Sequence, residues 1–447
     1  MPYQLSTIQN LFNAKHTGDD ITFQSISIDT RTLQPGDLFI AIIGEHLDGH
    51  DFIKAAEEKK AAAVLVSKPV HTNLPTLLVE DTTKALGQLA AYHRDQFDIP
   101  IIGITGSCGK TTTRSLVANI LQQANPTLSS LKSFNNAIGV PLTLLGLNDT
   151  HRYAVVEMGT NHFGEISYLT HIVKPTIALI TNAAPVHLEG LESVEGVSRA
   201  KGEIFEGLSE DGIAIINADD PFARYWTQLA SPRKCLTFSI EGHANVYAKD
   251  IQCNNQDITT FTLVTPTEEI PIQLPLLGRH NVANATAAGC IAYALSIRPK
   301  YIQTGIATVV PVDHRLNVYT GYQGARIIND SYNANPTAFK AAIAILADQP
   351  GKKILVSGDM KELGEHAEQY HEQLGIEAKK QGIEFLYTYG ELSKFAAQAF
   401  GENAQHFLDQ EELIATLKPL LNDQTTVLIK GSLSMNMRHV AEALKEN

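Results

Sequence analysis

The chain has 447 residues, of which 44% are hydrophobic and 19% charged, and its formal net charge is −13. This length predicts about three domains, each large enough to bury a core. The acidic balance and the lack of a long basic run argue against nucleic acid as a main partner, because nucleic-acid binding needs clustered Lys and Arg.

Cysteine usage and hydropathy indicate the compartment. The four cysteines, Cys108, Cys235, Cys253 and Cys290, form no Cys-x-x-Cys pair. Scattered cysteines are typical of a reducing compartment and argue against a zinc site or a disulfide framework. No apolar run reaches membrane-spanning length, and the N-terminus shows no basic region followed by an apolar core. We therefore expect a cytoplasmic protein without membrane insertion.

Residues 1–82 predict a small α/β domain, because short strand-like runs accompany helical stretches. The elements expected there and just beyond are strands at 26–29, 38–42 and 63–66 and helices at 52–60 and 82–97. The last helix leads directly to Pro100, where the chain enters its most informative motif.

That motif is a glycine-rich segment between a strand and a helix. It follows the apolar run 99–104, precedes the helical pattern 113–121, and consists of Thr105, Gly106, Ser107, Cys108, Gly109, Lys110, Thr111 and Thr112. In such a turn, backbone N–H groups and the helix dipole face phosphates, the lysine meets the outer oxygens, and a hydroxyl can ligate Mg²⁺. Ile104 stands where the strict pattern has glycine, yet two glycines still relieve the turn. We interpret the segment as a phosphate-binding loop rather than an ordinary connection.

The chain from 100 to 310 alternates apolar runs with helical stretches, which is typical of a mostly parallel sheet with crossover helices. Residues 245–276 show β-prone alternation and three prolines, and predict an antiparallel excursion. We interpret Pro311 as a hinge that precedes a second doubly wound sheet. The strands expected in the two sheets are 153–156, 177–180 and 212–216, then 325–328, 353–356 and 426–429.

Polar residues follow several of these strands, at the edge where an open α/β sheet binds its ligands. Glu157 directly follows a strand, and His187 lies five residues beyond Asn182, which follows another. A carboxylate near phosphates suits Mg²⁺, which takes hard oxygen ligands. The alternatives are a solvated strand end for Glu157 and a histidine satisfied within the fold for His187. The pattern around Lys201 by itself indicates an exposed helix lysine.

Three polar segments end expected strands of the C-terminal part. They are Asp330-Ser331-Tyr332-Asn333-Ala334-Asn335-Pro336, the glycine-bounded run 358–364, and Lys430-Gly431-Ser432. The first segment also fits a capped turn into a helix over 337–346, with an aspartate or asparagine as N-cap. Three such segments at one sheet edge predict a binding rim, although they do not reveal its ligand.

In this order, the motifs resemble those of the Mur ligase family, which builds the peptidoglycan stem peptide, over essentially the whole chain. The family-wide signals are 105–112, Glu157, His187, 278–284 and Arg315. The segments similar to family members that add a dipeptide are 135–141, 157–159, 182–189, 332–336 and 358–364. The segments that resemble the family's UDP-binding region are 29–31, 35–39 and 48–50.

The resemblance implies an α/β protein of three domains. They are 1–82 for the UDP-linked substrate, a P-loop ATPase-like sheet at 83–312 for ATP, and a Rossmann-like domain at 313–447 for the incoming dipeptide. The implied reaction is ATP-dependent amide ligation of D-alanyl-D-alanine to UDP-N-acetylmuramoyl-tripeptide through an acyl phosphate. We expect a cytoplasmic monomer with these small-molecule partners. The alternatives are a related ligase that adds a single amino acid, such as a folylpolyglutamate synthetase, and a non-catalytic nucleotide-binding module.

The resemblance also implies roles for individual residues. The expected catalytic residues are Lys110, Glu157, His187 and Lys201. Two Mg²⁺ ions are expected, with Thr111 on the first and with Glu157, His187 and Lys201, as a carbamate, on the second. The residues expected to hold ATP are 105–112, Asn281 and Asn284 near adenine, Asp330 near ribose and Arg315 near the phosphates. Those expected for the other substrates are Asp29, Thr30, Arg31, Asp48, Gly49, His50, Asn135, Asn136, Tyr332, Asn333 and Asn335.

Four residues depart from the family's usual pattern. Cys108 replaces a small polar residue, His314 replaces a glycine before Arg315, and the C-terminal part has Leu433 for arginine and Arg438 for an acidic residue. The change at 314 predicts a stiffer hinge.

Overall fold

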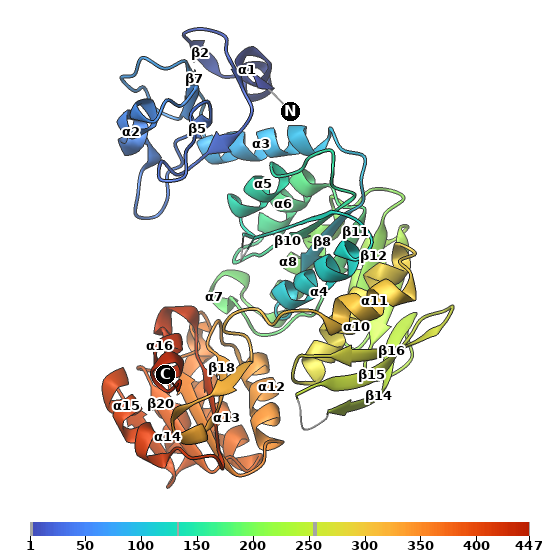
Figure 1. The fold of residues 1–447 in the computed structure, drawn as a ribbon, viewed down its shortest axis with the longest axis vertical. Coiled ribbons are helices and arrows are strands. Elements are labelled where there is room, and N and C mark those ends of the chain that lie inside the picture. Colours follow the sequence, from blue (N-terminus) through green and yellow to red (C-terminus); the bar gives the residue numbers. More distant parts are fainter. Residues whose placement is uncertain (1–2, 132–133, 254–256, 447) are drawn as a thin grey trace.

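The computed structural model describes residues 3–131, 134–253 and 257–446. Sheets of five, nine and six strands follow one another along the chain. Figure 1 shows them as three bodies, here called N-terminal, central and C-terminal, with the central body between the other two. All three are mixed but mostly parallel sheets flanked by helices, so the predicted α/β class is confirmed.

The N-terminal body is built on the five-stranded sheet, in the order β2-β7-β6-β5-β4, in which only β2 and β7 pair antiparallel. Its strands are β2 (Lys15–Thr17), β4 (Ile26–Ser27), β5 (Leu38–Ile40), β6 (Ala63–Val66) and β7 (Thr76–Leu78), and β1 (Tyr3–Gln4) pairs separately with β3 (Thr22–Phe23). Its helices are α1 (Leu5–Phe12), the 3₁₀ turn η1 (Gly49–Phe52), α2 (Ile53–Glu58) and α3 (Thr82–Arg94). The helix expected at 52–60 is thus two short pieces, because Asp48 caps a 3₁₀ turn before it.

The central sheet has the order β16-β15-β14-β13-β12-β11-β8-β10-β9. Its strands are β8 (Ile101–Thr105), β9 (Thr127–Ser129), β10 (Tyr153–Glu157), β11 (Ile177–Ile180), β12 (Ile213–Asn217), β13 (Lys234–Ser239), β14 (Val246–Cys253), β15 (Thr259–Val264) and β16 (Glu269–Leu274). Only the pairs β14–β15 and β15–β16 are antiparallel, which confirms the excursion expected at 245–276, although 254–256 lie outside the described residues. Because β10 and β11 flank β8 on opposite sides, the strand order reverses at β8, where such sheets bind ligands.

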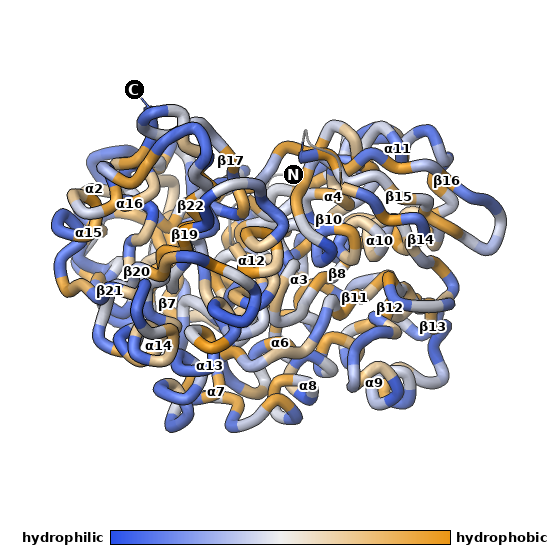
Figure 2. The backbone as a smooth tube through the Cα atoms, turned by 90° about the horizontal axis from the view of Figure 1, so that it is seen from below, coloured by the Kyte–Doolittle hydropathy of each residue, from blue (hydrophilic) through white to orange (hydrophobic). Residues whose placement is uncertain are grey.

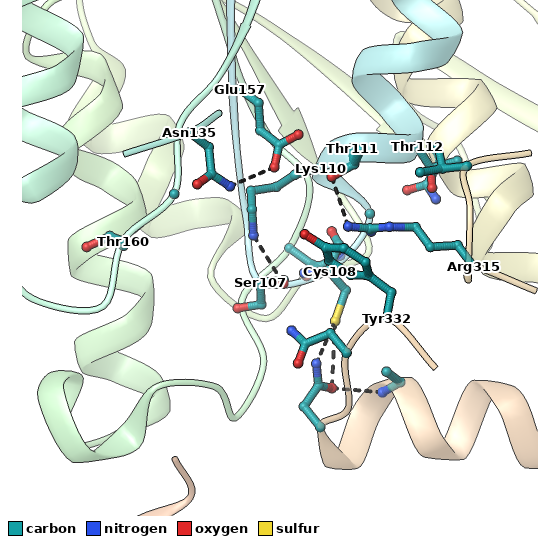
Figure 3. Close-up of a pocket in the computed structure, with 18 of the residues that line it drawn as sticks. Ser107, Cys108, Lys110, Thr111, Thr112, Asn135, Glu157, Thr160, Arg315 and Tyr332 are labelled. Carbon is teal, nitrogen blue, oxygen red and sulfur yellow. Dashed lines mark hydrogen bonds between the residues drawn. The ribbon is translucent and has the colours of Figure 1, made fainter. Parts of the chain in front are cut away.

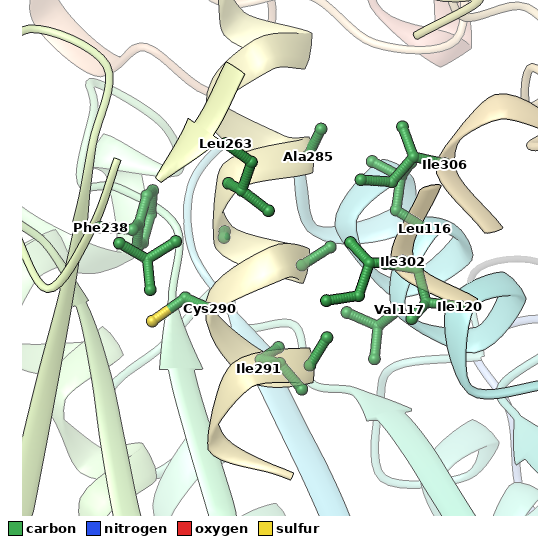
Figure 4. Close-up of a cluster of buried hydrophobic side chains, with 14 of the residues drawn as sticks. Leu116, Val117, Ile120, Phe238, Leu263, Ala285, Cys290, Ile291, Ile302 and Ile306 are labelled. Atoms are coloured by element: carbon green, nitrogen blue, oxygen red, sulfur yellow. The ribbon is translucent and has the colours of Figure 1, made fainter. Parts of the chain in front are cut away.

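Helices cover both faces of the central sheet. They are α4 (Lys110–Gln122), α5 (Gly139–Leu144), α6 (Glu165–Val173), α7 (Leu188–Leu191), α8 (Val194–Gly202), the turn η2 (Glu203–Phe205), α9 (Ala223–Ala230), α10 (Arg279–Ala294) and α11 (Pro299–Ala307). On one face, Leu116, Ile291 and Ile302 from α4, α10 and α11 pack in one buried cluster, drawn in Figure 4. On the other, Leu169 and Trp226 belong to a second cluster. Each fully buried side chain of this kind stabilises the fold by about 1.5–3 kcal/mol.

The C-terminal sheet has the order β17-β18-β22-β19-β20-β21, with only β17 and β18 antiparallel. Its strands are β17 (Asn317–Thr320), β18 (Arg326–Asp330), β19 (Lys352–Gly358), β20 (Phe385–Tyr389), β21 (Ala404–Phe407) and β22 (Thr425–Lys430). Its helices are α12 (Pro336–Ala347), α13 (Ala367–Lys380), α14 (Lys394–Phe400), α15 (Gln410–Leu417) and α16 (Met437–Ala443), with short 3₁₀ turns at Tyr322–Gly324, Gly364–His366, Lys418–Leu420 and Leu433–Met435. Neighbouring β18, β22 and β19 bring the three predicted polar segments to one sheet edge.

Hydropathy follows this architecture. Figure 2 shows hydrophobic stretches in the inner strands and helices and hydrophilic stretches in many of the outer loops. No helix in the described part of the chain has both the length and the apolar character needed to cross a bilayer.

Candidate active site

The loop between β8 and α4 is held in place by the segment that follows β11. Ser107 N and Cys108 N donate to the backbone oxygen and to Oδ1 of Asn182, both at 2.9 Å. The hydroxyl of Thr181 donates to the Cys108 carbonyl at 2.6 Å. A Cβ on Gly106 would lie 1.9 Å from that hydroxyl oxygen, and Gly106 has φ +145°, so this position requires glycine. The loop is therefore pre-shaped before any ligand arrives.

The loop lysine is folded back onto this turn. Lys110 Nζ donates to the Gly106 carbonyl at 2.6 Å. Figure 3 shows the lysine in the same view as Ser107, Glu157 and Arg315. Burial lowers the pKa of Lys110, and the nearby Glu157 carboxylate opposes that shift. Lys110 also begins α4, so its cation and the positive end of the helix dipole act on the same space.

Glu157 is buried at the end of β10, with 1% of its surface exposed. Its Oε1 accepts from Asn135 Nδ2 at 2.9 Å, while Oε2 has no hydrogen-bond partner and lies 3.7 Å from Arg114 Nε. The solvated strand-end interpretation is therefore wrong, because the segment carrying Asn135 covers the end of the strand. A buried carboxylate oxygen without a hydrogen bond is the kind of donor Mg²⁺ takes. This donor fits the metal expected from the sequence.

The remaining donors are of mixed type. No group of three or more His, Cys, Asp and Glu side chains with metal-binding spacing occurs among the residues that the structure describes. Any metal bound here would therefore also need other oxygen groups, such as the Thr111 hydroxyl on α4.

Lys201 is also buried, with 1% exposure, in the last turn of α8. Burial first, and then the charge of Lys110, lower the pKa of Lys201 well below its ordinary range. The pattern-based expectation of an exposed helix lysine is thus wrong. It failed because the fold buries Lys201 near Lys110 and Cys108 of the phosphate loop, which the local pattern does not reveal. A neutral amine is the form that can react with carbon dioxide, so this environment suits the expected carbamate.

His187 lies just before α7, at the boundary with the C-terminal body (Figure 1). Its Nδ1 hydrogen-bonds the carboxylate of Glu362, and Leu188 N donates to the Glu362 carbonyl at 3.1 Å. Burial lowers the pKa of His187 although Glu362 acts in the opposite direction.

The C-terminal body also reaches the phosphate loop. Arg315 Nη2 donates to Thr111 Oγ1 at 3.0 Å, and its guanidinium lies 4.2 Å from the centre of the Tyr332 ring. Asn335 Nδ2 contacts Cys108 Sγ at 3.2 Å, while its Oδ1 caps α12 by accepting from Ala338 N. The capped-turn interpretation of Asn335 is therefore confirmed, and the same residue also borders the cavity.

The predicted nucleoside residues come from α10 of the central body and from the end of β18 in the C-terminal body. Asn284 accepts from Thr113 Oγ1 at 3.2 Å and donates to Asn281 Oδ1 at 3.0 Å. Asp330 Oδ2 accepts from Lys430 Nζ at 2.6 Å, and that amine also donates to the Asn333 carbonyl at 2.9 Å. These contacts fix the orientation of polar groups along a concave wall.

One cavity of about 1000 Å³ lies between the central and C-terminal bodies and brings most of the predicted residues together. The predicted residues that line it are Ser107, Cys108, Gly109, Lys110, Thr111, Thr112, Asn135, Asn136, Glu157, His187, Asn281, Asn284, Arg315, Asp330, Tyr332, Asn333 and Asn335. Its size matches a site for a nucleotide-sized ligand. Thr105, Gly106 and Lys201 are buried and are not among its lining residues.

The six N-terminal candidates lie in the N-terminal body as two local groups, 29–31 and 48–50. Asp29 binds the Arg31 guanidinium through both carboxylate oxygens, and Thr30 lies between them. His50 Nδ1 is 2.6 Å from Asp48 Oδ1, its Nε2 accepts from Ser67 N at 2.9 Å, and Lys68 pairs with the second Asp48 oxygen at 2.6 Å. Gly49 is needed here because a Cβ would lie 2.7 Å from the Ile42 backbone.

Sequence reasoning gave no role to three residues that the structure places beside the site. Arg114 follows Lys110 by one helical turn, a spacing that could have revealed it. Lys430 and Glu362 lie in segments recognised as polar strand ends, but their partners, Asp330 and His187, are distant in sequence. No local pattern could have paired them.

A phosphate loop at the switch point of a parallel sheet, facing a second α/β body across a cavity, defines a phosphate-binding enzyme site of the doubly wound class. Sequence profiles support this class: the Mur ligase middle domain matches residues 104–292, the Mur ligase glutamate ligase domain 314–433, and the Mur ligase family catalytic domain 22–94. The chain belongs to the Mur ligase family.

Similar proteins agree in name. The chain is 42% identical to the UDP-N-acetylmuramoyl-tripeptide–D-alanyl-D-alanine ligase of Escherichia coli K12. The match covers 99% of this chain and 98% of that ligase. It is 34% identical to the ligase of that name from Bacillus subtilis, over 96% and 94% of the two chains. The crystal structure of MurF from Acinetobacter baumannii superposes with a TM-score of 0.94 at 33% identity, with 99% of each chain covered. MurF from Thermotoga maritima in complex with ADP gives 0.84 at 27% identity, with 94% and 96% covered.

Proposed function

We propose that this chain joins D-alanyl-D-alanine to UDP-N-acetylmuramoyl-tripeptide, converting ATP to ADP and phosphate, as a step of peptidoglycan precursor synthesis. The observation that carries the proposal is the shared cavity, in which a phosphate loop and a buried Glu157 oxygen without a hydrogen-bond partner face the C-terminal rim. The names of the similar ligases and their coverage of the whole chain support it. The absence of a membrane-crossing helix among the described residues and the small-molecule substrates fit a cytoplasmic enzyme, which we propose to be a monomer.

The phosphoryl-transfer end is the phosphate loop. A carboxylate is unreactive toward amines, so the γ-phosphorus bond to the ADP oxygen breaks while a bond to the tripeptide carboxylate oxygen forms, giving an acyl phosphate. Lys110 leaves the Gly106 carbonyl to neutralise the phosphate oxygens, and Arg315 moves from the Thr111 hydroxyl toward the same charges. Both cations already lie beside the loop, so each only exchanges a protein partner for the phosphate oxygens.

Magnesium would be held by Thr111 at one position and by Glu157, His187 and the carbamate of Lys201 at the other. When bound, it would neutralise charge on the phosphate oxygens. The neutral Lys201 amine forms the carbamate by attacking carbon dioxide: the new N–C bond leaves a carboxylate, and one proton departs to solvent. Asn135 holds one Glu157 oxygen and leaves the other open.

The acceptor end is the C-terminal rim. Tyr332, Asn333 and Asn335 supply the groups that orient the dipeptide so that its amine can attack the acyl carbon, after which phosphate leaves. The segment 313–447 would close onto the central body around Pro311 and exclude water, which would otherwise hydrolyse the acyl phosphate. His314 and Leu316 hold left-handed backbone at φ +61° and +53°, where non-glycine residues resist change, which fits a stiff hinge.

ATP and the UDP-linked substrate would bind at different places in the molecule. Asn281 and Asn284 of segment 83–312 would contact adenine. Asp330 of segment 313–447 would contact the ribose. The UDP-linked substrate would bind residues 1–82 through the cluster of Asp29, Thr30, Arg31, Asp48, Gly49 and His50, together with Asn135 and Asn136 of the central body. Each of the three bodies of Figure 1 would thus supply contacts to one main substrate, and neighbouring bodies would complete two of the sites.

The test is phosphate release from ATP with purified protein, Mg²⁺ and UDP-N-acetylmuramoyl-tripeptide, with and without D-alanyl-D-alanine. Tripeptides ending in meso-diaminopimelate and in L-lysine are compared, and single D- or L-amino acids replace the dipeptide in parallel. Release together with a pentapeptide product only with the dipeptide is the expected result. Turnover with a single amino acid would move the chain to a sister activity, and no turnover with any acceptor would contradict ligation.

A further inference from the structure

A contact between two bodies involves a residue expected to bind metal. His187 belongs to the central body and Glu362 to the C-terminal body, 175 residues apart in sequence. The His187 ring bonds the Glu362 carboxylate, and the next residue, Leu188, donates its N–H to the Glu362 carbonyl at 3.1 Å. Two bonds from adjacent residues to one partner fix both the place and the direction of the ring.

Glu362 is presented by a braced loop at the end of β19. The neighbouring Asp359 is completely buried and accepts from the backbone N–H groups of Glu391, Leu392 and Ser393 at 2.8–3.1 Å. Lys361 N donates to Ser432 Oγ at 3.0 Å, which ties the ends of β19 and β22 together. The loop therefore moves with the C-terminal sheet rather than independently of it.

Both residues of the contact have strained backbone. His187 has φ +51° and Glu362 has φ +63°, in the left-handed region that non-glycine residues rarely adopt. Such conformations are unfavourable for residues other than glycine and persist where the surrounding structure holds them. Holding two of them at one contact indicates that the direction of these side chains matters.

The contact determines which nitrogen of His187 is free. A histidine that ligates a metal is in its neutral form and carries a single N–H. An ionised carboxylate only accepts hydrogen bonds, so that N–H sits on Nδ1. The lone pair is then on Nε2, the nitrogen left to ligate a metal. Histidines that bind metals commonly have this carboxylate partner on the other nitrogen, and the partner orients the ring.

We propose that Glu362 is a positioning residue, which holds His187 with Nε2 as its metal-binding nitrogen only while the C-terminal body is docked on the central body. The inference rests on the proposed function, in which His187 ligates the second metal. It adds that the metal site is completed by a body that carries the incoming substrate. Docking of the C-terminal body and assembly of the metal site then become one event, which restricts phosphoryl transfer to the arrangement that can also ligate.

The test uses Mn²⁺ as a spectroscopic substitute for Mg²⁺, bound together with ADP, so that it does not depend on turnover. Pulsed electron paramagnetic resonance detects the coupling of a histidine nitrogen to Mn²⁺, and ¹⁵N-labelled histidine identifies it. The coupling is expected in the native protein and absent in His187→Asn. Glu362→Ala is expected to lose most of it and to weaken Mn²⁺ binding about 10–100-fold. Glu362→Gln, which keeps an accepting oxygen, is expected to lie between.

The matched control is Glu365→Ala, which removes an exposed glutamate from the same segment and is expected to behave like the native protein. A purely structural role for Glu362 would lower thermal stability and leave the nitrogen coupling of the folded fraction unchanged, and that result would overturn the inference. A nitrogen coupling that is the same in His187→Asn as in the native protein would also overturn it.

Dipeptide-dependent phosphate release by the native protein separates the two proposals. Turnover together with an unchanged coupling in Glu362→Ala contradicts the positioning role and leaves the ligase function standing. Loss of the coupling in Glu362→Ala without turnover by the native protein contradicts the ligase function and supports the positioning contact.

Discussion

The cavity beside the phosphate loop and the N-terminal cluster around Asp48 are both rich in charged side chains, but they differ in how those charges are satisfied. In the cavity, Glu157 Oε2 is buried without a hydrogen-bond partner, and Lys110 has only backbone carbonyls as partners. In the N-terminal cluster, Asp48 is bonded by both His50 and Lys68. Buried groups left without partners cost free energy unless a ligand completes them.

The comparison indicates that the cavity is prepared for ligand binding, whereas the N-terminal cluster maintains the shape of its own loops. At the phosphate loop, Lys110 and one Glu157 oxygen are desolvated and have no hydrogen bond from a side chain, so a ligand can still complete both. In the N-terminal cluster the charged side chains already pair with one another, so a ligand there meets a surface whose shape is fixed. Substitutions in the cavity should therefore affect chemistry far more than folding, and substitutions in the N-terminal cluster should mainly affect substrate affinity.

The largest effect is expected from Lys110→Met. Removal of the only cation inside the turn leaves the developing phosphate charge uncompensated, and the rate of phosphate release should fall about 10²–10³-fold or more. The midpoint of thermal unfolding should not fall, because a desolvated amine is replaced by an apolar chain of similar length. Lys84→Met, at an exposed position on α3, is the control. A variant at position 110 with a tenth of native activity would contradict this role.

Glu157→Gln should come next, because it removes the charge and keeps the shape. Without a carboxylate oxygen for Mg²⁺, turnover should fall about 100-fold, and half-maximal activity should need more Mg²⁺. Asn135→Ala removes only the hydrogen bond from Asn135 Nδ2 to Glu157 Oε1. It should lower turnover about 10–100-fold. Magnesium titrations of steady-state activity measure both, and equal losses in the two variants would show that orientation alone, not charge, matters.

Lys201→Met should combine loss of activity with a gain in stability. The pKa of Lys201 is lower in the folded protein than its ordinary value of 10.5, so the unfolded chain binds more protons at neutral pH and native stability rises with pH. The variant escapes this cost, so its unfolding midpoint should be higher by roughly 2–4 °C at pH 7 and should approach the native value near pH 10. Calorimetry in carbon dioxide-free buffer measures the difference, and a gain that grows with pH would contradict a neutral buried amine.

The smallest effect on stability is expected from Asp29→Asn. Hydrogen bonds from Arg31 lower the pKa of Asp29 to about 2, so the ion pair stabilises the fold above the ordinary carboxyl pKa and is lost as the pH falls toward 2. At pH 7 the substitution should cost less than about 1 kcal/mol, because the pair is largely solvent-exposed. Denaturant titrations at pH 7 and pH 3 measure this loss. If the cluster binds the UDP-linked substrate, the KM for that substrate should rise while kcat is kept; an unchanged KM would remove Asp29 from the proposed substrate site.

Much of the fold could be predicted because its signals are local. Apolar runs of strand length placed β10, β11 and β22 within one or two residues, and the phosphate loop was recognisable from its glycines and the lysine that follows them. The order of these motifs along the chain also identified the family, which the profile matches confirm. Boundaries were less accurate where capping decided them, as at η1, where Asp48 starts a 3₁₀ turn.

The sequence by itself determined the element types, the phosphate loop and the family, because each depends on residues close together in the chain. Only the tertiary structure decided the states of Glu157, Lys201 and His187, because burial and partners come from segments far away. Burial by other elements lowered the pKa of Lys201 and left one Glu157 oxygen without a hydrogen-bond partner. The pairing of His187 with Glu362 joins two bodies, and desolvation and contact at such distances are properties of the folded chain alone.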